Sequence, residues 1–380
     1  NKKEVMSKIN VRSPYFIYQS SSSNNPLLSV AVSIRIYAGA SDTSMSGSQY
    51  SLTINAVDGE ATFDMSELIR DYIYNSFDGD YTDSFRWVNY SVLPTFQNGN
   101  GLNNLYTRGA FDGYGYFEDG SNPQNNQTVL QSNTTIFTND FANINIPIHV
   151  TEDITVSYLK DGEIIFTKDL VYSTNSTDQV QYVQNSSLDA DVFKQRVDAI
   201  TGTTVESFNC VKAIANDVYQ EFDADSIYID KGGDIEVIKV KEVEECKHNP
   251  YKVTFVNKFG VLQDLWFFKR SNLSLKTKQE SYKANIISNG TYSTNTRQNT
   301  IFNKAGSESL QLNTGFYPES YNEIFRQLSL SEEAWINYDG KTLPITIKSS
   351  SLNYKTRVND KLINYTIDVE FSNDKINNIR

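Results

Sequence analysis

Cysteine and histidine are the scarcest residues of this 380-residue chain, with two of each. The two cysteines, Cys210 and Cys246, cannot form a disulfide scaffold or a four-cysteine zinc site, and the sequence favours two unpaired thiols over one bridge between them. A Ser-His-Asp or Cys-His centre would have to use His149 or His248, which lie far apart in the chain. Each is typical of a surface or turn histidine, so neither indicates catalysis.

Long apolar runs and a basic charge balance are also lacking. No stretch of 18 apolar residues occurs, so no transmembrane helix is expected. The first residues, Asn1–Glu4, are not followed by the apolar segment of a signal peptide. The formal net charge of −12 argues against a general binder of nucleic acid or of anionic membranes, because both need a basic face. We therefore expect neither as a partner.

Local motifs for catalysis, metals and cofactors are missing as well. The sequence contains no Walker A loop, no G-x-S-x-G, no H-E-x-x-H and no C-x-x-C. The segment Asp78–Asp80 with Asp83 resembles part of a calcium loop, but the required Gly and Glu are absent, which favours a solvated turn. Gly232 and Gly233 lie in a predicted hairpin turn and not before a helix, so they form no phosphate cradle. The sequence predicts no catalytic residue, no metal site and no cofactor.

Alternating apolar residues are the dominant pattern that is present. Residues 30–37 read V-A-V-S-I-R-I-Y, which places every second residue on one buried face of a strand. Asp161-Gly162 lies between two alternating runs and predicts a hairpin, because both turn residues need a positive φ. Short strands joined by polar loops favour an antiparallel sheet. We predict a mainly β protein with a few short helices: an antiparallel, Ig-like β-sandwich in the N-terminal region and an α+β domain at the C-terminus.

Two short helices are expected. In "FDMSELIRDYI", Asp64 and Glu67 have the spacing of a capping box, and Phe63 and Leu68 occupy the hydrophobic-staple positions. The second helix opens at Pro318-Glu319. The buried stripes are expected to be Leu68, Ile69, Tyr72 and Ile73 in the first helix, and Tyr321, Ile324, Phe325 and Leu328 in the second.

Composition divides the chain into three predicted segments. Residues 1–145 are expected to form the sandwich-like domain with long loops, 146–245 a middle β region, and 246–380 the C-terminal α+β domain. Within the first segment, residues 110–117 read as a strand beside a long loop. The Asn-, Gly- and Ser-rich region Asn98–Asn133 is predicted to be an excursion outside the sheet core.

The densest aromatic cluster lies in "YKVTFVNKFGVLQDLWFFKRS", from Tyr251 to Ser271. Its alternation around a Gly-containing turn predicts a core hairpin. Trp266, Phe267 and Phe268 are consecutive and cannot all face one side of a strand. We therefore name them, with Tyr114 and Tyr116, as candidate intersubunit or interdomain contacts, against the alternative of a role inside one domain. Residues 363–371 alternate and predict a long strand with one buried face.

The hairpin above, "ESYNEIFRQLSLSEEAWI" and "NDKLINYTIDVEFSNDK" (Asn359 to Lys375) resemble virion proteins of tailed bacteriophages, especially those that infect Bacteroidota. The N-terminal "SPYFIYQ", "IRIYAG" and "FDMSELIRDYI" resemble their leading Ig-like domain. The resemblance implies a structural and non-enzymatic subunit of a ring at the tail tip, baseplate or neck. Its partners would be further copies of itself and other tail or neck proteins. It would be located in the virion after assembly in the host cytoplasm.

Two alternatives stay open. One is a secreted carbohydrate-binding β-sandwich protein, because Tyr and Asn suit wet contacts with sugars and proteins. The other is a glycan-degrading β enzyme, which would need two carboxylates across a cleft. No local motif selects such a pair.

Overall fold

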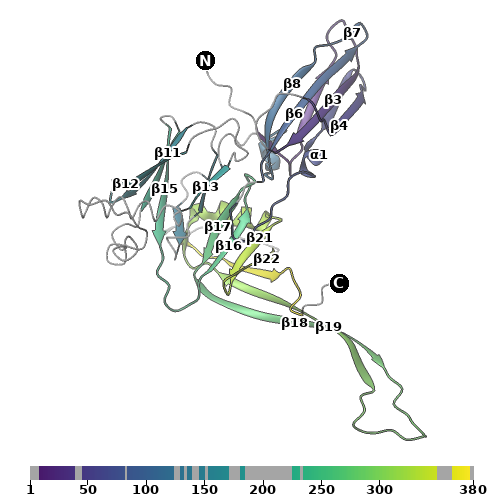
Figure 1. The fold of residues 1–380 in the computed structure, drawn as a ribbon, viewed down its shortest axis with the longest axis vertical. Coiled ribbons are helices and arrows are strands. Elements are labelled where there is room, and N and C mark those ends of the chain that lie inside the picture. Colours follow the sequence, from purple (N-terminus) through teal and green to yellow (C-terminus); the bar gives the residue numbers. More distant parts are fainter. Residues whose placement is uncertain are drawn as a thin grey trace. The chain divides into compact units, whose positions relative to one another are not determined.

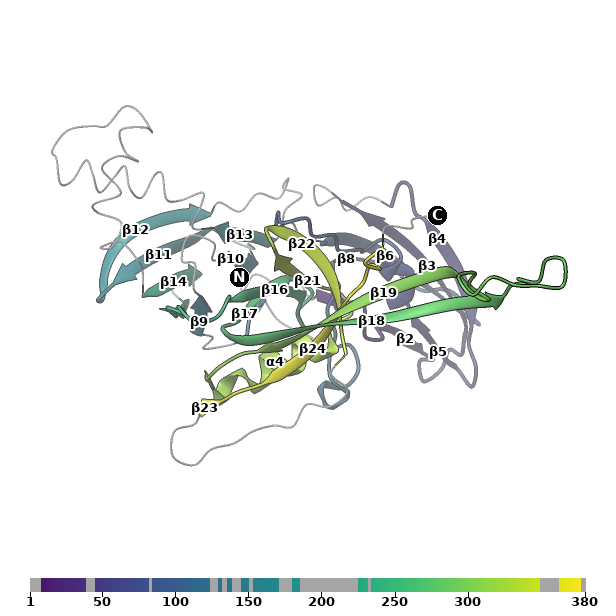
Figure 2. The ribbon, with the colours of Figure 1, turned by 90° about the horizontal axis from the view of Figure 1, so that it is seen from below.

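The computed structural model describes residues 8–38, 45–81, 84–123, 129–131, 135–138, 145–149, 153–170, 180–184, 225–231, 234–348 and 362–376. The chain divides into two compact units, Asn1–Glu244 with Thr254–Leu265, and Glu245–Val253 with Trp266–Arg380. Both units are built mainly of antiparallel strands, as the sequence predicted (Figures 1 and 2). The division into three segments remains a prediction.

The first unit begins with a six-stranded sheet in the order β1-β8-β6-β3-β4, with β7 beside β6. All neighbours are antiparallel except β1 and β8. A two-stranded sheet, β2-β5, shares one hydrophobic core with it, which makes this part sandwich-like. The strands are β1 (Lys8–Asn10), β2 (Phe16–Ser20), β3 (Leu27–Tyr37), β4 (Tyr50–Asn55), β5 (Glu60–Asp64), β6 (Arg86–Phe96), β7 (Gly99–Asn100) and β8 (Asn104–Phe111).

Alternation along β3 supplies much of this core. Val30, Val32, Ile34 and Ile36 are buried on one face, which confirms the predicted pattern. Burying four such side chains contributes on the order of 6–12 kcal/mol before the entropy of folding is subtracted. The short helix α1 (Ser66–Arg70) adds Leu68, which is partly buried, and Ile69, which is buried. Tyr72 and Ile73 of the predicted stripe also pack on this core, but they follow the end of the helix, which is shorter than predicted.

The start of α1 differs from the prediction. The Asp64 carboxylate accepts hydrogen bonds from the Ser66 backbone N–H at 3.0 Å and from the Tyr15 backbone N–H at 2.9 Å. Glu67 takes no part, and Met65 precedes the helix without a side-chain cap. The predicted capping box is therefore wrong. Asp64 is shared between the helix start and a distant backbone segment, which a local spacing rule does not reveal.

The predicted excursion at Asn98–Asn133 is also wrong over much of its length. β8 lies inside the sheet between β1 and β6, and Ala110 and Phe111 are buried. The strand ends at Phe111, so residues 110–117 are not a strand as predicted; a short 3-10 helix, η1 (Phe117–Asp119), follows. The first half of β8 is exposed or half-buried on both faces, which removed the alternation that would have marked it.

A five-stranded sheet in the order β12-β11-β14-β15-β9 completes the first unit together with a two-stranded sheet, β10-β13. At the β11–β12 turn, Asp161 and Gly162 have φ values of 51° and 83°, which confirms the predicted hairpin. The strands are β9 (Thr135–Thr138), β10 (Asn145–His149), β11 (Ile154–Lys160), β12 (Glu163–Leu170), β13 (Val180–Gln184), β14 (Ser226–Lys231) and β15 (Asp234–Glu242).

A seven-stranded sheet in the order β17-β16-β21-β22-β24-β19-β18 dominates the C-terminal part. Asp339 and Gly340 form the turn that joins β21 to β22, with φ values of 50° and 71°. β20 and β23 form a separate two-stranded sheet. The strands are β16 (Tyr251–Val256), β17 (Leu262–Phe267), β18 (Lys269–Lys283), β19 (Asn299–Asn313), β20 (Tyr317–Pro318), β21 (Ala334–Tyr338), β22 (Lys341–Ile347), β23 (Leu362–Ile363) and β24 (Thr366–Phe371).

The predicted C-terminal helix is confirmed. A 3-10 turn, η4 (Glu319–Tyr321), leads into α4 (Asn322–Leu330), and the stripe Tyr321, Ile324, Phe325 and Leu328 is buried. The Phe325 ring lies 4.6 Å from that of Tyr365 and 5.7 Å from that of Tyr317, measured between centroids.

The final strand has the predicted face but not the predicted continuity. Ile363, Tyr365, Ile367, Val369 and Phe371 are all buried. The strand is interrupted between β23 and β24, where the Tyr365 N–H donates to the Thr314 hydroxyl at 2.9 Å.

Candidate assembly interface

The most unusual element of the second unit is the hairpin of β18 and β19, each 15 residues long. We call residues 273–305, which include its outer halves and its loop, the arm. β24 pairs with β19 over Ser309–Asn313, and the Lys375 N–H adds one bond to the Gly306 carbonyl. Beyond Gly306, within the described part of the chain, the two strands pair only with each other. Figure 1 shows the arm extending past the other strands of this sheet.

No residue of the arm is buried, and every residue from Leu273 to Lys283 is exposed. Both faces of the ribbon therefore meet solvent. At about 3.4 Å per residue, this exposed stretch of β18 has a length of roughly 35 Å. The arm lacks the apolar layer that normally supports a sheet. A two-stranded hairpin without such a layer is at best marginally stable in water.

Large apolar side chains are nevertheless frequent on the arm. Ile287, Tyr292 and Phe302 are 64%, 68% and 63% exposed. The others of this kind on the arm are Leu273, Leu275, Tyr282 and Ile301. A series of exposed apolar groups on one projecting element is typical of a protein-contact surface.

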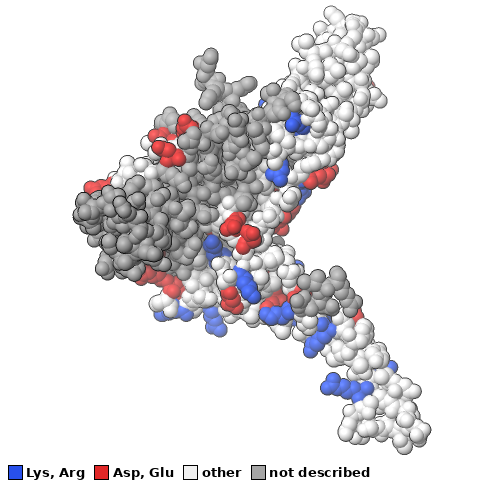
Figure 3. Space-filling view, viewed as in Figure 1, with Lys and Arg blue, Asp and Glu red and all other residues white. Residues whose placement is uncertain are grey.

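The charge of the arm has the opposite sign to that of the chain. The arm contains five basic residues and one acidic residue, Glu280, and so carries +4. Because the whole chain carries −12, the remainder carries −16. The basic residues are Lys276, Lys278, Lys283, Arg297 and Lys304. Figure 3 shows blue side chains along this element.

Local devices shape the arm at its tip, middle and base. Asn289 and Gly290, with φ values of 52° and 74°, form a tight turn that is closed by the pairing of Ser288 with Thr291. The register shifts between Glu280 and Ser281, so that one additional residue, Phe302, is accommodated in β19. Where β18 begins, the Lys269 ammonium donates to the Glu245 carboxylate at 2.5 Å, which lowers the pKa of Glu245 to about 2.

An open cavity of about 280 Å³ lies where the arm leaves the sheet. The rings of Tyr338 and Phe371 line it and meet edge to face, with centroids 5.3 Å apart. Tyr338 also stacks on Tyr251 at 5.7 Å. Burial, followed by the nearby Tyr251 and Asp339, raises the pKa of Tyr338, so its hydroxyl stays protonated at neutral pH. The rim carries charged groups from the β21–β22 turn and from the segment after β24.

The three consecutive aromatic residues that the sequence singled out lie in the second unit. Phe267 and Phe268 are buried, and Trp266 is half-buried. β17 ends at Phe267 and β18 starts at Lys269, so the strand is broken where two neighbouring rings enter the interior. Phe268 stacks on Trp266 and on Tyr317, at centroid distances of 6.4 and 6.2 Å. Their role as contacts to another subunit or domain stays a prediction.

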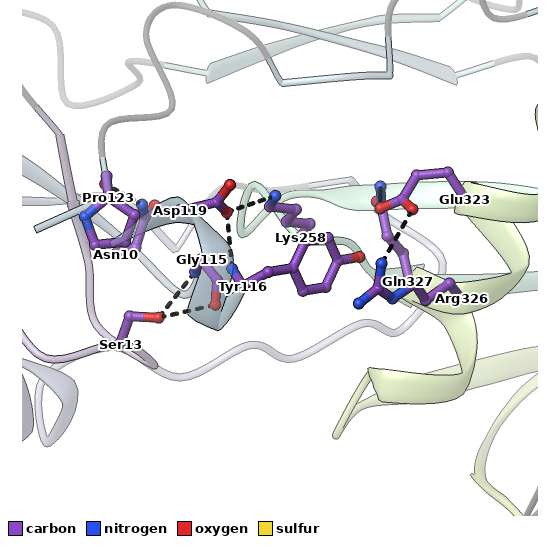
Figure 4. A network of polar contacts seen from close by, with 10 residues as sticks. All are labelled: Asn10, Ser13, Gly115, Tyr116, Asp119, Pro123, Lys258, Glu323, Arg326 and Gln327. Carbon is purple, nitrogen blue, oxygen red and sulfur yellow. Dashed lines mark hydrogen bonds and ion pairs between the residues drawn. The ribbon is translucent and has the colours of Figure 1, made fainter. Parts of the chain in front are cut away.

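Tyr114 and Tyr116 lie in the first unit, where the Tyr114 N–H donates to the Lys258 carbonyl in the β16–β17 turn at 2.9 Å. Figure 4 shows Tyr116 beside Lys258. Tyr114 is buried, and its ring meets that of Tyr116 at 5.8 Å. The Lys258 ammonium lies 4.0 Å from the Tyr116 ring centroid and 2.9 Å from the Asp119 carboxylate. These contacts hold the two tyrosines within their own unit. The structure thus places Tyr114 and Tyr116 in contact with each other. Phe117, the next residue in the chain, is 99% exposed and was not predicted as a contact residue.

Within the first unit, the β16–β17 turn packs closely against the backbone of Asp112 and Gly113. A Cβ at Gly260, which has a φ of 79°, would lie 2.6–2.8 Å from backbone atoms of Asp112 and Gly113. The Asn257 amide donates to the Val129 carbonyl at 2.9 Å. The glycine is therefore required both for its positive φ and for the absence of a side chain.

A half-buried polar cluster within the first unit includes residues of the same hairpin. The Asp264 carboxylate accepts hydrogen bonds from the Tyr81 hydroxyl at 2.6 Å, the Thr254 hydroxyl at 2.7 Å and the Asn145 amide at 3.3 Å. Burial, then the charge of Asp264, raises the pKa of Tyr81, which keeps the phenol protonated as a donor. The cluster satisfies a carboxylate that burial would otherwise penalise, and so it has a structural explanation.

Cys246 is an exposed free thiol, and Cys210 lies outside the described residues. His149 belongs to β10 and His248 to an irregular segment before β16. The segment Asp78–Asp80 forms an exposed bend, while Asp83 is outside the described residues. Among the residues that the structure describes, no three His, Cys, Asp or Glu side chains are grouped as metal ligands would be, and no helix could cross a membrane.

No protein-family model matches the chain, and no curated protein sequence is significantly similar to it.

Proposed function

We propose that the chain is a structural subunit of a bacteriophage virion, in the tail, baseplate or neck, and that it forms a closed ring through its arm. The observation that carries the proposal is the exposure of β18 and β19 on both faces over residues 273–305. The phage context rests on the sequence resemblance described above. Assembly, not catalysis, is the function that an unsupported projecting ribbon favours.

A partner would supply what the arm lacks. An apolar or complementary surface laid against the ribbon removes Ile287, Tyr292 and Phe302 from water, at roughly 25 cal/mol per Å² of apolar area buried. It also provides the second layer that a stable sheet needs. The exposed β18 edge carries lysines, which discourage unspecific strand pairing. The arm is thus suited to a specific contact and protected against aggregation.

The asymmetry of this contact is compatible with the proposed ring. The arm and the surface that would receive it are different parts of the chain, so the contact between two copies is head-to-tail. Such contacts close into a ring when the rotation between copies divides a full turn. The basic arm on an acidic chain favours another copy of the same chain as the partner, because opposite charges raise the association rate and oppose wrong pairings.

The test compares the full chain with a shortened arm. Thr277 and Gly306 are opposite each other in the register, so replacing residues 278–305 with Asn-Gly leaves a two-residue hairpin. Mass photometry and negative-stain images should show a fixed copy number for the full chain and monomers for the shortened chain. Circular dichroism and thermal melting should agree for both, because the removed residues are not buried. A full chain that stays monomeric at high concentration and is absent from purified virions would overturn the proposal.

A further inference from the structure

We infer that the cavity at the base of the arm receives the arm tip of a second copy, with Arg297 as the group that enters it. This inference rests on the proposed function and adds the receiving surface.

The cavity rim retains negative charge. Glu308 and Lys375 neutralise each other in an ion pair at 3.0 Å. Of the other charged lining residues, Asp339 and Asp374 are acidic and Lys341 is basic, so the rim has a net charge of −1. Within the described part of the chain, neither Asp339 nor Asp374 forms an ion pair. A cation is the complementary ligand.

The lining favours a planar cation over a compact one. The cavity combines the rings of Tyr338 and Phe371 with Leu343 and Pro344, and carboxylates stand at the rim. A guanidinium group stacks on aromatic faces and donates paired hydrogen bonds to a carboxylate, whereas an ammonium group is a strongly hydrated point charge. The chemistry of the cavity is therefore that of an arginine site.

The arm tip, by which we mean the loop of residues 284–298, carries one guanidinium group. In the outer loop between β18 and β19, residues 284–298, Arg297 is the single charged residue. It is exposed, and in the described residues its side chain has no ion pair. Ile287 and Tyr292 of the same loop are exposed and would cover the apolar rim around a bound guanidinium. An anchoring arginine with apolar neighbours is a common composition for an interface centre.

The tip cannot occupy the cavity of its own copy. β19 runs extended from Asn299 to Gly306, a distance of roughly 24 Å at 3.4 Å per residue. The cavity lies at the Gly306 end, where Glu308 lines it. Because β18 pairs with β19 along this stretch, the ribbon does not fold back on itself. The occupant is therefore another copy, and each copy offers one tip and one cavity, as a head-to-tail ring requires.

The test uses two charge reversals and their mixture. Arg297→Glu and Asp374→Lys should each weaken self-association at least tenfold, as measured by mass photometry across a dilution series. Mixing the two variants should restore mixed assemblies, because the reversed charges again complement each other. Lys304→Glu is the matched control: it makes the same change of charge on the arm away from the tip and should alter association less than threefold. Arg297→Lys should be intermediate, because the charge stays but the planar paired donors are lost.

Failure of this inference and failure of the proposed function give different results. If both reversals assemble like the original chain while the shortened arm does not, the arm is an assembly element but the cavity is not its receptor. If the shortened arm also assembles, the proposed function is wrong. If a glycan array shows sugar binding that Asp374→Lys abolishes without changing assembly, the cavity is a carbohydrate site and the inference is overturned.

Discussion

Two hairpins that follow each other in the chain, β16–β17 and β18–β19, have the same backbone pairing and opposite surroundings. In the first, Val253 and Phe255 are fully buried and the turn packs on neighbouring backbone at Gly260. In the second, no residue from 273 to 305 is buried. The difference shows that hydrogen-bonded pairing alone does not identify what stabilises a hairpin. The first is completed within its own chain, and we propose that the second is completed by another copy.

The largest expected effect contrasts a core residue with an arm residue. Phe255→Ala should lower the free energy of unfolding by about 3–5 kcal/mol, because it removes a fully buried ring and leaves a cavity. Leu275→Ala, at an exposed position of the arm, should change it by less than about 0.5 kcal/mol. Urea unfolding of dilute protein measures both. A loss below about 1 kcal/mol for Phe255→Ala would show that the first hairpin is not a core element.

A glycine in each turn separates the effect of φ from that of packing. Gly260→Ala should cost about 3 kcal/mol or more, because its positive φ is strained and its Cβ would collide with backbone. Gly290→Ala has a similar φ of 74° but nothing within 4 Å of the added Cβ, so about 1 kcal/mol is expected. Thermal unfolding of the two variants gives the comparison. Equal losses would mean that the tight approach at Gly260 contributes nothing.

Tyr81→Phe tests the polar cluster on the first hairpin. Removing the hydroxyl leaves Asp264 with one strong donor fewer, which should cost about 1–3 kcal/mol at pH 7. The folded-state pKa of Tyr81 is raised above the unfolded value of 10.0, so its contribution is complete below pH 10 and falls as the pH rises above it. The stability difference between the original chain and Tyr81→Phe should therefore narrow between pH 7 and pH 10.5. Urea titrations at both pH values would show a constant difference if the phenol ionises normally in the folded state.

The smallest effect on folding is expected for the arm surface itself. Changing Leu273 and Leu275 together to Ser should leave the unfolding of the dilute protein within about 0.5 kcal/mol of the original. The same change should weaken self-association, because it removes apolar area from the proposed contact. Sedimentation velocity over a concentration series measures the association. Unchanged association would exclude this part of the ribbon from the interface.

The contrast between the hairpins also explains what the sequence could predict. β3 and α4 were predictable because one face of each is buried, and burial of one face creates the periodic pattern. The Asp161-Gly162 and Asp339-Gly340 turns were predictable because few residues adopt a positive φ. The arm has solvent on both faces, so no alternation marks most of its length. The Asn289-Gly290 turn at its end has positive φ values and was not predicted.

The candidate site could not be assembled from the sequence for a related reason. Tyr338 and Phe371 are 33 positions apart and meet only because β22 pairs with both β21 and β24. Long-range pairing of this kind leaves no local pattern. The aromatic run at Trp266–Phe268 was conspicuous in the sequence, but a break in the strand turns Phe267 and Phe268 into the interior. Local density of aromatic residues therefore did not indicate exposure.

Hydrogen exchange as a function of protein concentration tests the central claim most directly. In dilute protein, backbone amides of β16 and β17 should be protected, while those between Lys276 and Lys304 should exchange rapidly. At concentrations at which the chain assembles, protection should rise along the arm and stay unchanged in β16 and β17. An arm that is already protected in the dilute monomer, or that remains unprotected in the assembly, would contradict the account that a second copy completes this ribbon.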